Sequence, residues 1–287
     1  MTEAVRQKVP SRVLRRFLRS PLSLVGVVVV TVTLICALLA PWVAPYPQDA
    51  GAVVHFDQSM QAPSVAHWFG TDEVGRDILS RVIFGTRPAL LFVIVVLGIA
   101  LTVGIVTGLV AGYWPGSRLA ALILRVTDIF LSIPPLALAL AVTVAFNPSL
   151  ATAMIAVSFT WWPWYTRLVY GEVLKLRNEL FVDAARALGQ RDSVIMLRHI
   201  LPNMISPIVV KATLDISFVI LLGSSLSFLG IGAQEPTPDW GAMVARGRVY
   251  LPDGWWVSTM PGLAIFVVVV GFNLLGDALR DALDVRS

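Results

Sequence analysis

The 287-residue sequence is poor in charge and almost free of cysteine. Only 14% of its residues are charged, against roughly 25% in a soluble domain, while 56% are hydrophobic and the mean hydropathy is +0.77. This deficit excludes an ordinary water-soluble domain and indicates a chain solvated by lipid. The single cysteine, Cys36, lies within the first apolar run, which excludes a disulfide framework and a cysteine-rich metal site.

The sequence also lacks the motifs of common catalytic and nucleotide-binding sites. His55, His67 and His199 are far apart, and none begins an H-E-x-x-H zinc helix. None of the three lysines completes a G-x-x-x-x-G-K-[ST] loop, and there is no G-x-S-x-G nucleophile elbow. We therefore predict no catalytic residue, no metal site and no cofactor in this chain, and no nucleic-acid partner.

Six runs with few or no charges are long enough to cross a bilayer, since a transmembrane helix needs about 20 apolar residues. A helix satisfies its own backbone hydrogen bonds in lipid, so each run is predicted as one membrane-spanning helix. The sequence thus predicts an all-α polytopic membrane protein with six transmembrane helices, at residues 21–43, 89–113, 119–146, 150–170, 205–229 and 259–279.

Lysine and arginine are distributed unevenly over the segments that join these spans. If successive joints lie on opposite sides, one side holds 17 of the 22 cationic residues and the other holds 5. Because positive charge accumulates on the cytoplasmic side, the amphipathic N-terminus (1–20), the loop 171–204 and the tail 280–287 are predicted to be cytoplasmic, and the loops 44–88 and 230–258 external. The first run is longer than the apolar region of about 7 to 15 residues in a secretory signal, which favours a retained span over a cleaved leader.

Each external loop contains a segment with its own pattern. In 69–87, five apolar residues fall on one stripe of a helix: Ile78, Leu79, Val82, Ile83 and Phe84. This stripe predicts a helix that lies flat on the outer interface, either bracing the external mouth or serving as a plain connector. The closely spaced glycines and prolines of 230–242 predict a constrained turn, with Trp240 as an anchor at the membrane interface.

Asp215 lies inside the fifth predicted span, where an ionised carboxylate must face the bundle interior or find a partner. An unpaired Asp at the bilayer centre costs about 2.5 to 3.5 kcal/mol on insertion scales. Lys211 precedes it by one helical turn, and this i, i+4 spacing predicts an ion pair.

Asp128 lies inside the third predicted span and has Arg125 one turn before it and Ser132 one turn after it. A proline pair beginning at Pro134 follows and weakens the helix. This cluster either lets the helix bend or settles the helix against its neighbours. Asp128 and Asp215 are also the two carboxylates that an intramembrane aspartate hydrolase would need, but they share no motif context.

The cytoplasmic loop between the fourth and fifth predicted spans carries the strongest functional signal. Apolar residues cover much of a short helix over 181–188, and Gly189 supplies its end. A second short helix is predicted over 193–200. Two short helices that meet at a glycine make a rigid protrusion, on which the small residues Ala184 and Ala185 would let the backbone of a partner come close.

The spacing D-A-A-x-x-x-G, followed by L-P, resembles the EAA loop of bacterial importer permeases of the ATP-binding-cassette class. In that family the first of the two helices docks in a groove of the ATPase and transmits its closure to the spans. Carried over by position, the docking residues are Asp183, Ala184, Ala185, Arg186, Gly189, Leu201 and Pro202. The sequence departs from the family pattern in having Asp183 where glutamate is usual and His199 where isoleucine is usual.

Further strings narrow the resemblance to the C-type permeases of the dipeptide, oligopeptide and nickel importers. They are RRFLRSPLSLVG at 15–26, FGTDEVGRDILSRVIFGTR at 69–87, LSFLGIGAQEPTPDWGAM at 226–243 and MPGLAIFVVVVGFNLLGDALRDALDVR at 260–286. The resemblance covers essentially the whole chain and implies a permease core domain over 89–287.

The resemblance implies one transmembrane half of an ATP-driven importer in a prokaryotic inner membrane. The expected partners are a homologous B-type permease, one or two ATPase subunits that bind ATP and Mg²⁺, an external solute-binding protein and the lipid bilayer. The expected cargo is a short peptide, with nickel chelate, glutathione or another small solute as alternatives. Two other classes remain open at this point, an ion-coupled carrier and a membrane scaffold that transports nothing.

Overall fold

The computed structural model describes residues 21–283 and builds them mainly from helices. Within that range the β-type pairing is limited to an isolated bridge between Thr71 and Asp77. The longer helices are α2 (Pro21–Val43), α3 (Ile78–Tyr113), α4 (Arg118–Leu131), α5 (Pro135–Ala145), α6 (Leu150–Leu176), α9 (Ile205–Phe228) and α11 (Trp255–Leu283). The predicted amphipathic segment 1–20 and the last four residues of the predicted tail lie outside the described residues.

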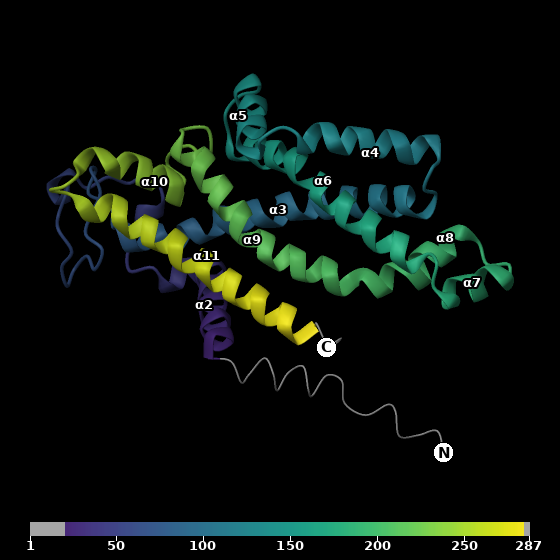
Figure 1. The fold of residues 1–287 in the computed structure, drawn as a ribbon. Coiled ribbons are helices and arrows are strands. Elements are labelled where there is room, and N and C mark those ends of the chain that lie inside the picture. Colours follow the sequence, from purple (N-terminus) through teal and green to yellow (C-terminus); the bar gives the residue numbers. More distant parts are fainter. Residues whose placement is uncertain (1–20, 284–287) are drawn as a thin grey trace, which may run out of the picture.

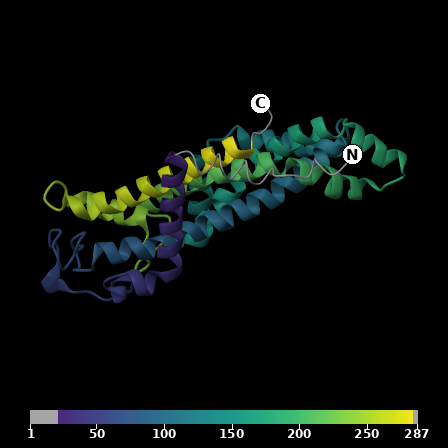
Figure 2. The same cartoon turned by 90° about the horizontal axis from the view of Figure 1, so that it is seen from below.

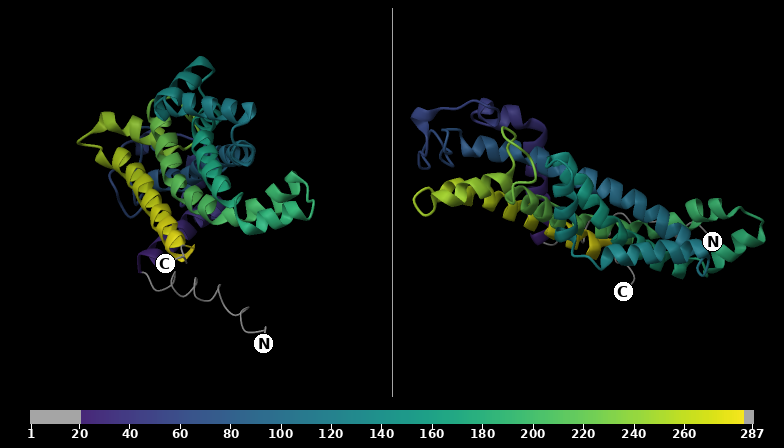
Figure 3. Two further views of the ribbon diagram at one scale, coloured as in Figure 1. Left: turned by 45° about the vertical axis from the view of Figure 1, so that its right-hand side comes forward. Right: turned by 90° about the horizontal axis from the view of Figure 1, so that it is seen from above.

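Shorter helical elements lie between the long ones. Their bounds are η1 Pro47–Ala50, η2 Phe56–Gln58, α7 Leu180–Ala187, α8 Asp192–Val194, η3 Ile195–Ile200, η4 Leu201–Met204, α10 Trp240–Gly247 and η5 Arg248–Tyr250. The molecule is elongated, with the loops around α10 at one end and α7 and α8 at the other (Figure 1). Figure 2 shows that α2 crosses the long helices instead of running beside them, and Figure 3 gives two further views of this arrangement.

Four helical segments of the described chain are long and apolar enough to span a membrane. They are Pro21–Val43, Ile78–Tyr113, Asp192–Phe228 and Trp255–Leu283, and the bent pair α4 and α5 makes a fifth if it counts as one span. The helical character of the prediction is thus confirmed, with four or five candidate spans where the sequence predicts six. When α4 and α5 count as one span, the difference is α6, whose middle residues 160–165 are mostly aromatic instead of aliphatic.

The second predicted span begins earlier than expected. The Asp77 carboxylate caps α3 by accepting hydrogen bonds from the Ser80 backbone N–H at 2.8 Å and the Ser80 hydroxyl at 2.7 Å. From there α3 continues through Pro88 to Tyr113. The prediction of a separate flat helix over 69–87 is therefore wrong, because the apolar stripe that begins at Ile78 is packed inside the protein as the first turns of α3.

The helices α3 and α6 share the most extensive contact in the described bundle. Three glycines spaced four residues apart on α3, Gly104, Gly108 and Gly112, face α6. A Cβ atom at Gly108 would lie 2.6 Å from the Cβ of Val169, and one at Gly112 would lie 2.7 Å from the Cβ of Val173. Small residues at this spacing let two membrane helices approach closely, so this face fixes α6 alongside α3.

The third predicted span, 119–146, is not one straight helix. Its two parts, α4 and α5, meet at a bend of 90°. The break falls where Pro134 precedes Pro135, the first residue of α5, and a residue before proline is disfavoured in the helical conformation. The prediction that this proline pair weakens the helix is confirmed, and the bend places α4 and α5 against different parts of α6 (Figure 1).

Trp240 is buried within the protein and not exposed as a membrane anchor would be, so that prediction is wrong. It opens α10, is 3% exposed, and its indole donates a 2.9 Å hydrogen bond to the carbonyl of Val82 in α3. A Cβ atom at Gly85 would lie 2.6 Å from the indole nitrogen of Trp240. Trp240 therefore joins the 230–258 loop to the start of α3.

Candidate functional site

The outer and inner faces of α7 differ in the way a docking element requires. Its inner residues Val182 and Ala185 are buried, Ala185 being 4% exposed. On the outer side Leu180 is 86% exposed, and Asp183 and Ala184 are also exposed. Ala184 is thus placed where the sequence predicts a partner's close approach, whereas Ala185 packs inward and is not available to a partner.

Gly189 ends α7 in the manner expected from the sequence. Its φ is +73°, a left-handed conformation that glycine adopts without the steric cost of a Cβ atom. The N–H of Gly189 donates to the carbonyl of Arg186 at 2.9 Å, and the N–H of Gln190 donates to that of Ala185 at 3.1 Å. This pair of bonds is a Schellman motif, which closes the helix and turns the chain sharply.

The predicted second short helix is not a separate element. From Asp192 the chain passes through α8, one π-type turn (η3) and one 3₁₀ turn (η4) directly into α9. Leu201 and Pro202 lie in η4, where Leu201 packs at the edge of the apolar cluster that supports α7. These two residues therefore belong to the base of the protrusion and not to its outer face.

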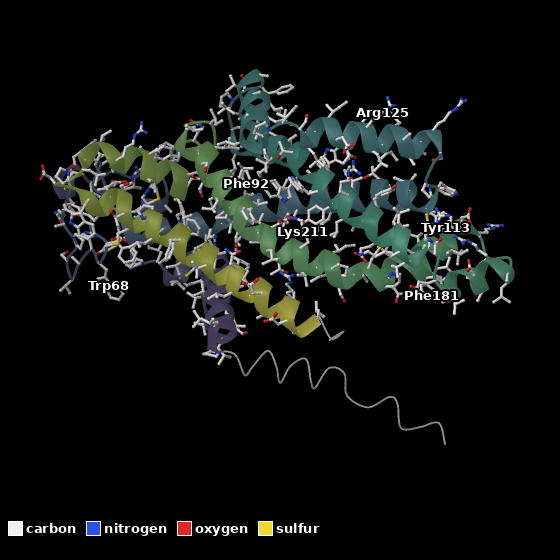
Figure 4. The ribbon with its side chains drawn as sticks, in the orientation of Figure 1. Trp68, Phe92, Tyr113, Arg125, Phe181 and Lys211 are labelled. Atoms are coloured by element: carbon white, nitrogen blue, oxygen red, sulfur yellow. The ribbon has the colours of Figure 1, made fainter. Side chains whose placement is uncertain are left out.

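An apolar cluster holds the protrusion on the bundle. It joins residues of four long or short helices and the turns before α9: Leu109, Tyr113, Val169, Val173, Val182, Ala185, Ile195, Ile200, Met204 and Ile208. Within this cluster α7 packs mainly on η3, and the cluster continues from there to α3, α6 and α9. Figure 4 shows Tyr113 and Phe181 at this end of the molecule.

Tyr113, the last residue of α3, makes the polar connections of this cluster. Its hydroxyl donates a 2.7 Å hydrogen bond to Asp192, and its ring lies 5.6 Å from the guanidinium carbon of Arg186. Arg177 donates a 3.2 Å hydrogen bond to the Tyr113 carbonyl. Arg186 also forms a 3.1 Å ion pair with Asp183 on the outer face of α7. Arg186, itself a predicted docking residue, therefore connects that face to α3. Sequence reasoning missed Tyr113, which stands at the end of an apolar run without any motif.

The predicted pairing of Lys211 with Asp215 is confirmed. The Lys211 ammonium lies 2.7 Å and 2.9 Å from the two carboxylate oxygens, and Asp215 is buried. The indole of Trp161 on α6 donates a further hydrogen bond of 3.1 Å to Asp215. The carboxylate is thus satisfied from its own helix and from α6, as a charge within a span requires.

Asp128 pairs with Arg167 of α6, a residue that the sequence analysis does not single out. Arg125, one turn before Asp128, instead points away from α6 (Figure 4). Ser132 donates from its hydroxyl to the carbonyl of Ile129 at 2.7 Å, and Pro134 lies in the bend between α4 and α5. In the sequence Arg167 is a lone cation near the end of the predicted span 150–170.

The opposite end of the molecule contains a cluster of buried and half-buried charges. The Glu235 carboxylate accepts hydrogen bonds from Arg76 at 2.8 Å and Arg81 at 3.1 Å and also pairs with Arg246. Asp72 pairs with Arg76 at 2.8 Å. Burial raises the pKa of Glu235, but the three arginines lower it by more, so the pKa lies below its usual value. The cluster ties the 230–239 loop to the start of α3.

Within residues 21–283, no three or more histidine, cysteine, aspartate or glutamate side chains gather in an arrangement that could hold a metal ion. His55 and His67 are instead engaged with Asp49 and Asp77, at 3.2 Å and 2.9 Å respectively. The candidate functional features of the chain are the protrusion that contains α7, the two ion pairs Asp128–Arg167 and Lys211–Asp215, and the Glu235 cluster.

Comparison with curated proteins finds relatives along nearly the whole chain. The chain is 42% identical over 268 residues to a probable D,D-dipeptide transport system permease protein, DdpC, of Escherichia coli strain K12, covering 93% of this chain and 89% of that protein. It is 40% identical to the dipeptide transport system permease protein DppC of Alkalihalophilus pseudofirmus (93% and 86% covered) and 42% identical to the glutathione transport system permease protein GsiD of Escherichia coli O157:H7 (94% and 88% covered).

Among solved structures, the fold is similar to that of a chain of the methionine ABC transporter MetNI in inward-facing conformations. The TM-score is 0.58 at 19% sequence identity, and the match covers 70% of this chain and 95% of that one. Residues 11–63 match the N-terminal transmembrane domain of oligopeptide transport permease C. Residues 104–287 match the model of the binding-protein-dependent transport system inner membrane component, and the chain belongs to this family of ABC transporter permeases.

Proposed function

We propose that the chain is a transmembrane permease subunit of an ATP-driven importer of short peptides in a prokaryotic inner membrane. The curated relatives are named for transport of dipeptides, D,D-dipeptides and glutathione, which share free charged ends and a peptide backbone. The chain itself hydrolyses nothing in this proposal. ATP and Mg²⁺ bind to ATPase partners, a second permease completes the pathway, and a solute-binding protein delivers the cargo.

The observation that carries the proposal is the two-faced construction of α7. Leu180 and Ala184 lie on its exposed outer face, and its inner face packs into an apolar cluster that includes residues of α3, α6 and α9. A solvent-exposed leucine at the tip of a short helix is stabilised when a partner covers it. In the proposed mechanism, closure of the ATPase subunits moves α7, and the supporting cluster transmits that motion to α3, α6 and α9.

The same proposal includes six spans with both termini in the cytoplasm. The glycine face keeps α6 alongside α3, which is long and apolar enough to span. Two helices in contact along such a length cross the membrane together, which adds α6 to the four or five candidate spans. The excess of cationic residues then favours a cytoplasmic location for the 171–204 protrusion.

The test is a substitution at Ala184 in the complete complex of both permeases, ATPases and binding protein. Ala184→Arg introduces a long charged side chain at an exposed position, so it should leave the protein in the membrane but prevent the ATPase from co-purifying. Ala184→Ser is the matched control of nearly unchanged size and should retain the ATPase. Normal ATPase recovery with Ala184→Arg would show that the docking surface lies elsewhere.

The cargo is tested with the wild-type complex in liposomes containing ATP. L-Ala-L-Ala, D-Ala-D-Ala and reduced glutathione are the three labelled probes, each with the binding protein present. ATP-dependent uptake of at least one of these probes supports a peptide importer. If none of the three probes is taken up, the proposed cargo class is wrong.

A further inference from the structure

One face of the bundle exposes charged and aromatic side chains from three helices that contain predicted spans, α4, α6 and α9. On α6, Trp164 is 45% exposed and the Arg167 side chain 39%. On α4 the Asp128 side chain is 55% exposed, and on α9 the Lys211 side chain is 33% exposed. We call Asp128, Trp164, Arg167 and Lys211 the paired-charge face.

These four side chains come from neighbouring helices. The helix α6 contacts both α4 and α9 and lies between them (Figure 1). Arg167 pairs with Asp128 on one side of α6, and on the other side the Lys211 ammonium lies 6.0 Å from the centre of the Trp164 ring. Trp164 and Arg167 are three residues apart, a rise of about 4.5 Å along α6, so the two contacts lie on the same side of α6 within one helical turn.

The exposure of these charges separates them from a purely structural pair. Asp215 shows what a structural charge looks like in this bundle, since it is buried and bonded to Lys211 and Trp161 together. Asp128 and Arg167 are exposed and are bonded to one another across α4 and α6. Charged side chains within membrane proteins face the bundle interior or a water-filled cavity, so this face is directed at a polar space and not at lipid.

We propose that the paired-charge face binds the two charged ends of a short zwitterionic peptide as it crosses the membrane. The peptide carboxylate is held by Arg167 and Lys211, its ammonium group by Asp128, and a side chain or peptide plane lies on Trp164. The assignment rests on the proposed function, and it names the cargo class that this chain itself recognises, a peptide with free amino and carboxyl ends.

The self-paired state of Arg167 and Asp128 suits a site in a pathway. A peptide that binds there replaces the Arg167–Asp128 ion pair by two ion pairs of its own, so neither protein charge is left unpaired before or after binding. The gain in binding is consequently modest, and a transported molecule must bind weakly enough to leave. Lys211 retains Asp215 as its partner throughout, which keeps its ammonium group in place.

The first test measures uptake and ATP turnover together in the reconstituted complex, with the probe that the wild type transports. Arg167→Gln and Asp128→Asn should each lower uptake at least tenfold, while stimulation of ATP hydrolysis by the loaded binding protein stays within twofold. Lys175→Gln is the matched control, because Lys175 is an exposed cation of the same helix that pairs with Glu172 and lies eight residues, about 12 Å, beyond Arg167. It should leave uptake unchanged.

The exchanged double variant, Asp128→Arg with Arg167→Asp, separates binding from structure. An ion pair that serves only to hold α4 on α6 would be restored by the exchange, and uptake with it. A peptide site would have its charges reversed relative to Lys211 and Trp164, so uptake should stay low. Restored uptake in the exchanged variant, or normal uptake with Arg167→Gln, would overturn the proposal.

The second test measures occupancy directly and needs no binding protein. Gly171 lies one turn beyond Arg167, and a Cβ atom there meets no atom within 4 Å, so Gly171→Cys in a Cys36→Ser background gives an accessible reporter. With partner subunits free of cysteine, millimolar L-Ala-L-Ala should slow maleimide labelling of this cysteine, and N-acetyl-L-Ala-L-Ala-amide should not. Equal rates with both would contradict the site, whereas loss of ATP-dependent uptake of all probes by the wild type would contradict the proposed function instead.

Discussion

The hydroxyl of Tyr113 donates a 2.7 Å hydrogen bond to Asp192, joining the last residue of α3 to the first residue of the helical run that continues into α9. The two residues lie at the base of α7, whose Arg186 guanidinium also rests over the Tyr113 ring. A force on α7 therefore reaches α3 through a side chain that is itself 4% exposed and packed on all sides.

Tyr113→Phe should weaken the coupling of ATP hydrolysis to delivery of cargo. The ring and its packing remain, and the variant loses one hydrogen bond worth about 1 kcal/mol. If that bond favours the docked position of the protrusion, its loss changes the equilibrium constant for docking roughly fivefold. The measurement is the ATP hydrolysis rate of the reconstituted complex with and without loaded binding protein.

Tyr170→Phe is the control for this experiment, because the Tyr170 hydroxyl makes no hydrogen bond within residues 21–283. It should leave the stimulation of hydrolysis unchanged. Stimulation by the loaded binding protein that is equal in both variants would show that the Tyr113 hydroxyl has no part in coupling.

Gly108→Leu should prevent α6 from packing on α3. A Cβ atom at this position already lies 2.6 Å from Val169 Cβ, so a larger side chain forces the helices apart. We expect little or no intact complex on size-exclusion chromatography after detergent extraction. Gly98→Leu is the matched control on the same helix, because a Cβ atom at Gly98 meets nothing within 4 Å. Equal recovery of the two variants would contradict the assigned packing.

The features that sequence reasoning predicted correctly depend on residues close together in the chain. The Lys211–Asp215 pair follows from four-residue spacing on one helix, and the end of α7 follows from a single glycine at position 189. The membrane-spanning character follows from composition alone. In each case the physical cause acts within about one helical turn or is a sum over a whole segment.

The features that it missed are set by contacts between distant parts of the chain. Asp128 and Arg167 are 39 residues apart, and Glu235 is 159 residues from Arg76. Tryptophan is a typical residue of the membrane interface, but Trp240 is instead buried against α3. There its indole donates to the Val82 carbonyl and packs on Gly85. The four-residue spacing of glycines on α3 is visible in the sequence and indicates a close helix–helix contact. That α6 is the helix in contact is visible only in the folded chain.

Glu235→Gln should reduce stability at neutral pH and have less effect in acid. Since the folded-state pKa of Glu235 lies below its usual value, the carboxylate stabilises the fold above the unfolded-state pKa of about 4.3. That contribution is lost as the pH falls through the folded-state pKa. The difference in melting temperature between wild type and Glu235→Gln, measured on the detergent-solubilised complex, should therefore be constant above about pH 5 and shrink as the pH falls from there to about pH 3.

Two comparisons make the result specific to Glu235. Asp72 and Glu73 also pair with arginines of this cluster, but they are present in both proteins and cancel in the difference. Asp57→Asn removes an exposed carboxylate outside the cluster and should shift the melting temperature little at any pH. A melting-temperature gap for Glu235→Gln that stays constant from pH 7 to about pH 3 would mean that its charge does not stabilise the loop.

Trp161→Phe should loosen the contact of α6 with α9. The substitution keeps an aromatic ring but removes the 3.1 Å hydrogen bond to the buried Asp215 carboxylate. Side-chain hydrogen bonds between membrane helices contribute about 0.6 kcal/mol on average and at most about 1.7 kcal/mol, and a charged acceptor places this one toward the upper value. The expected loss in the free energy of unfolding, followed by denaturant titration in mixed micelles, is therefore about 1 to 1.7 kcal/mol. Trp42→Phe, at an exposed position of α2, should change it by less than about 0.5 kcal/mol, as surface substitutions do. Similar losses in the two variants would show that the Asp215 carboxylate is held by Lys211 alone.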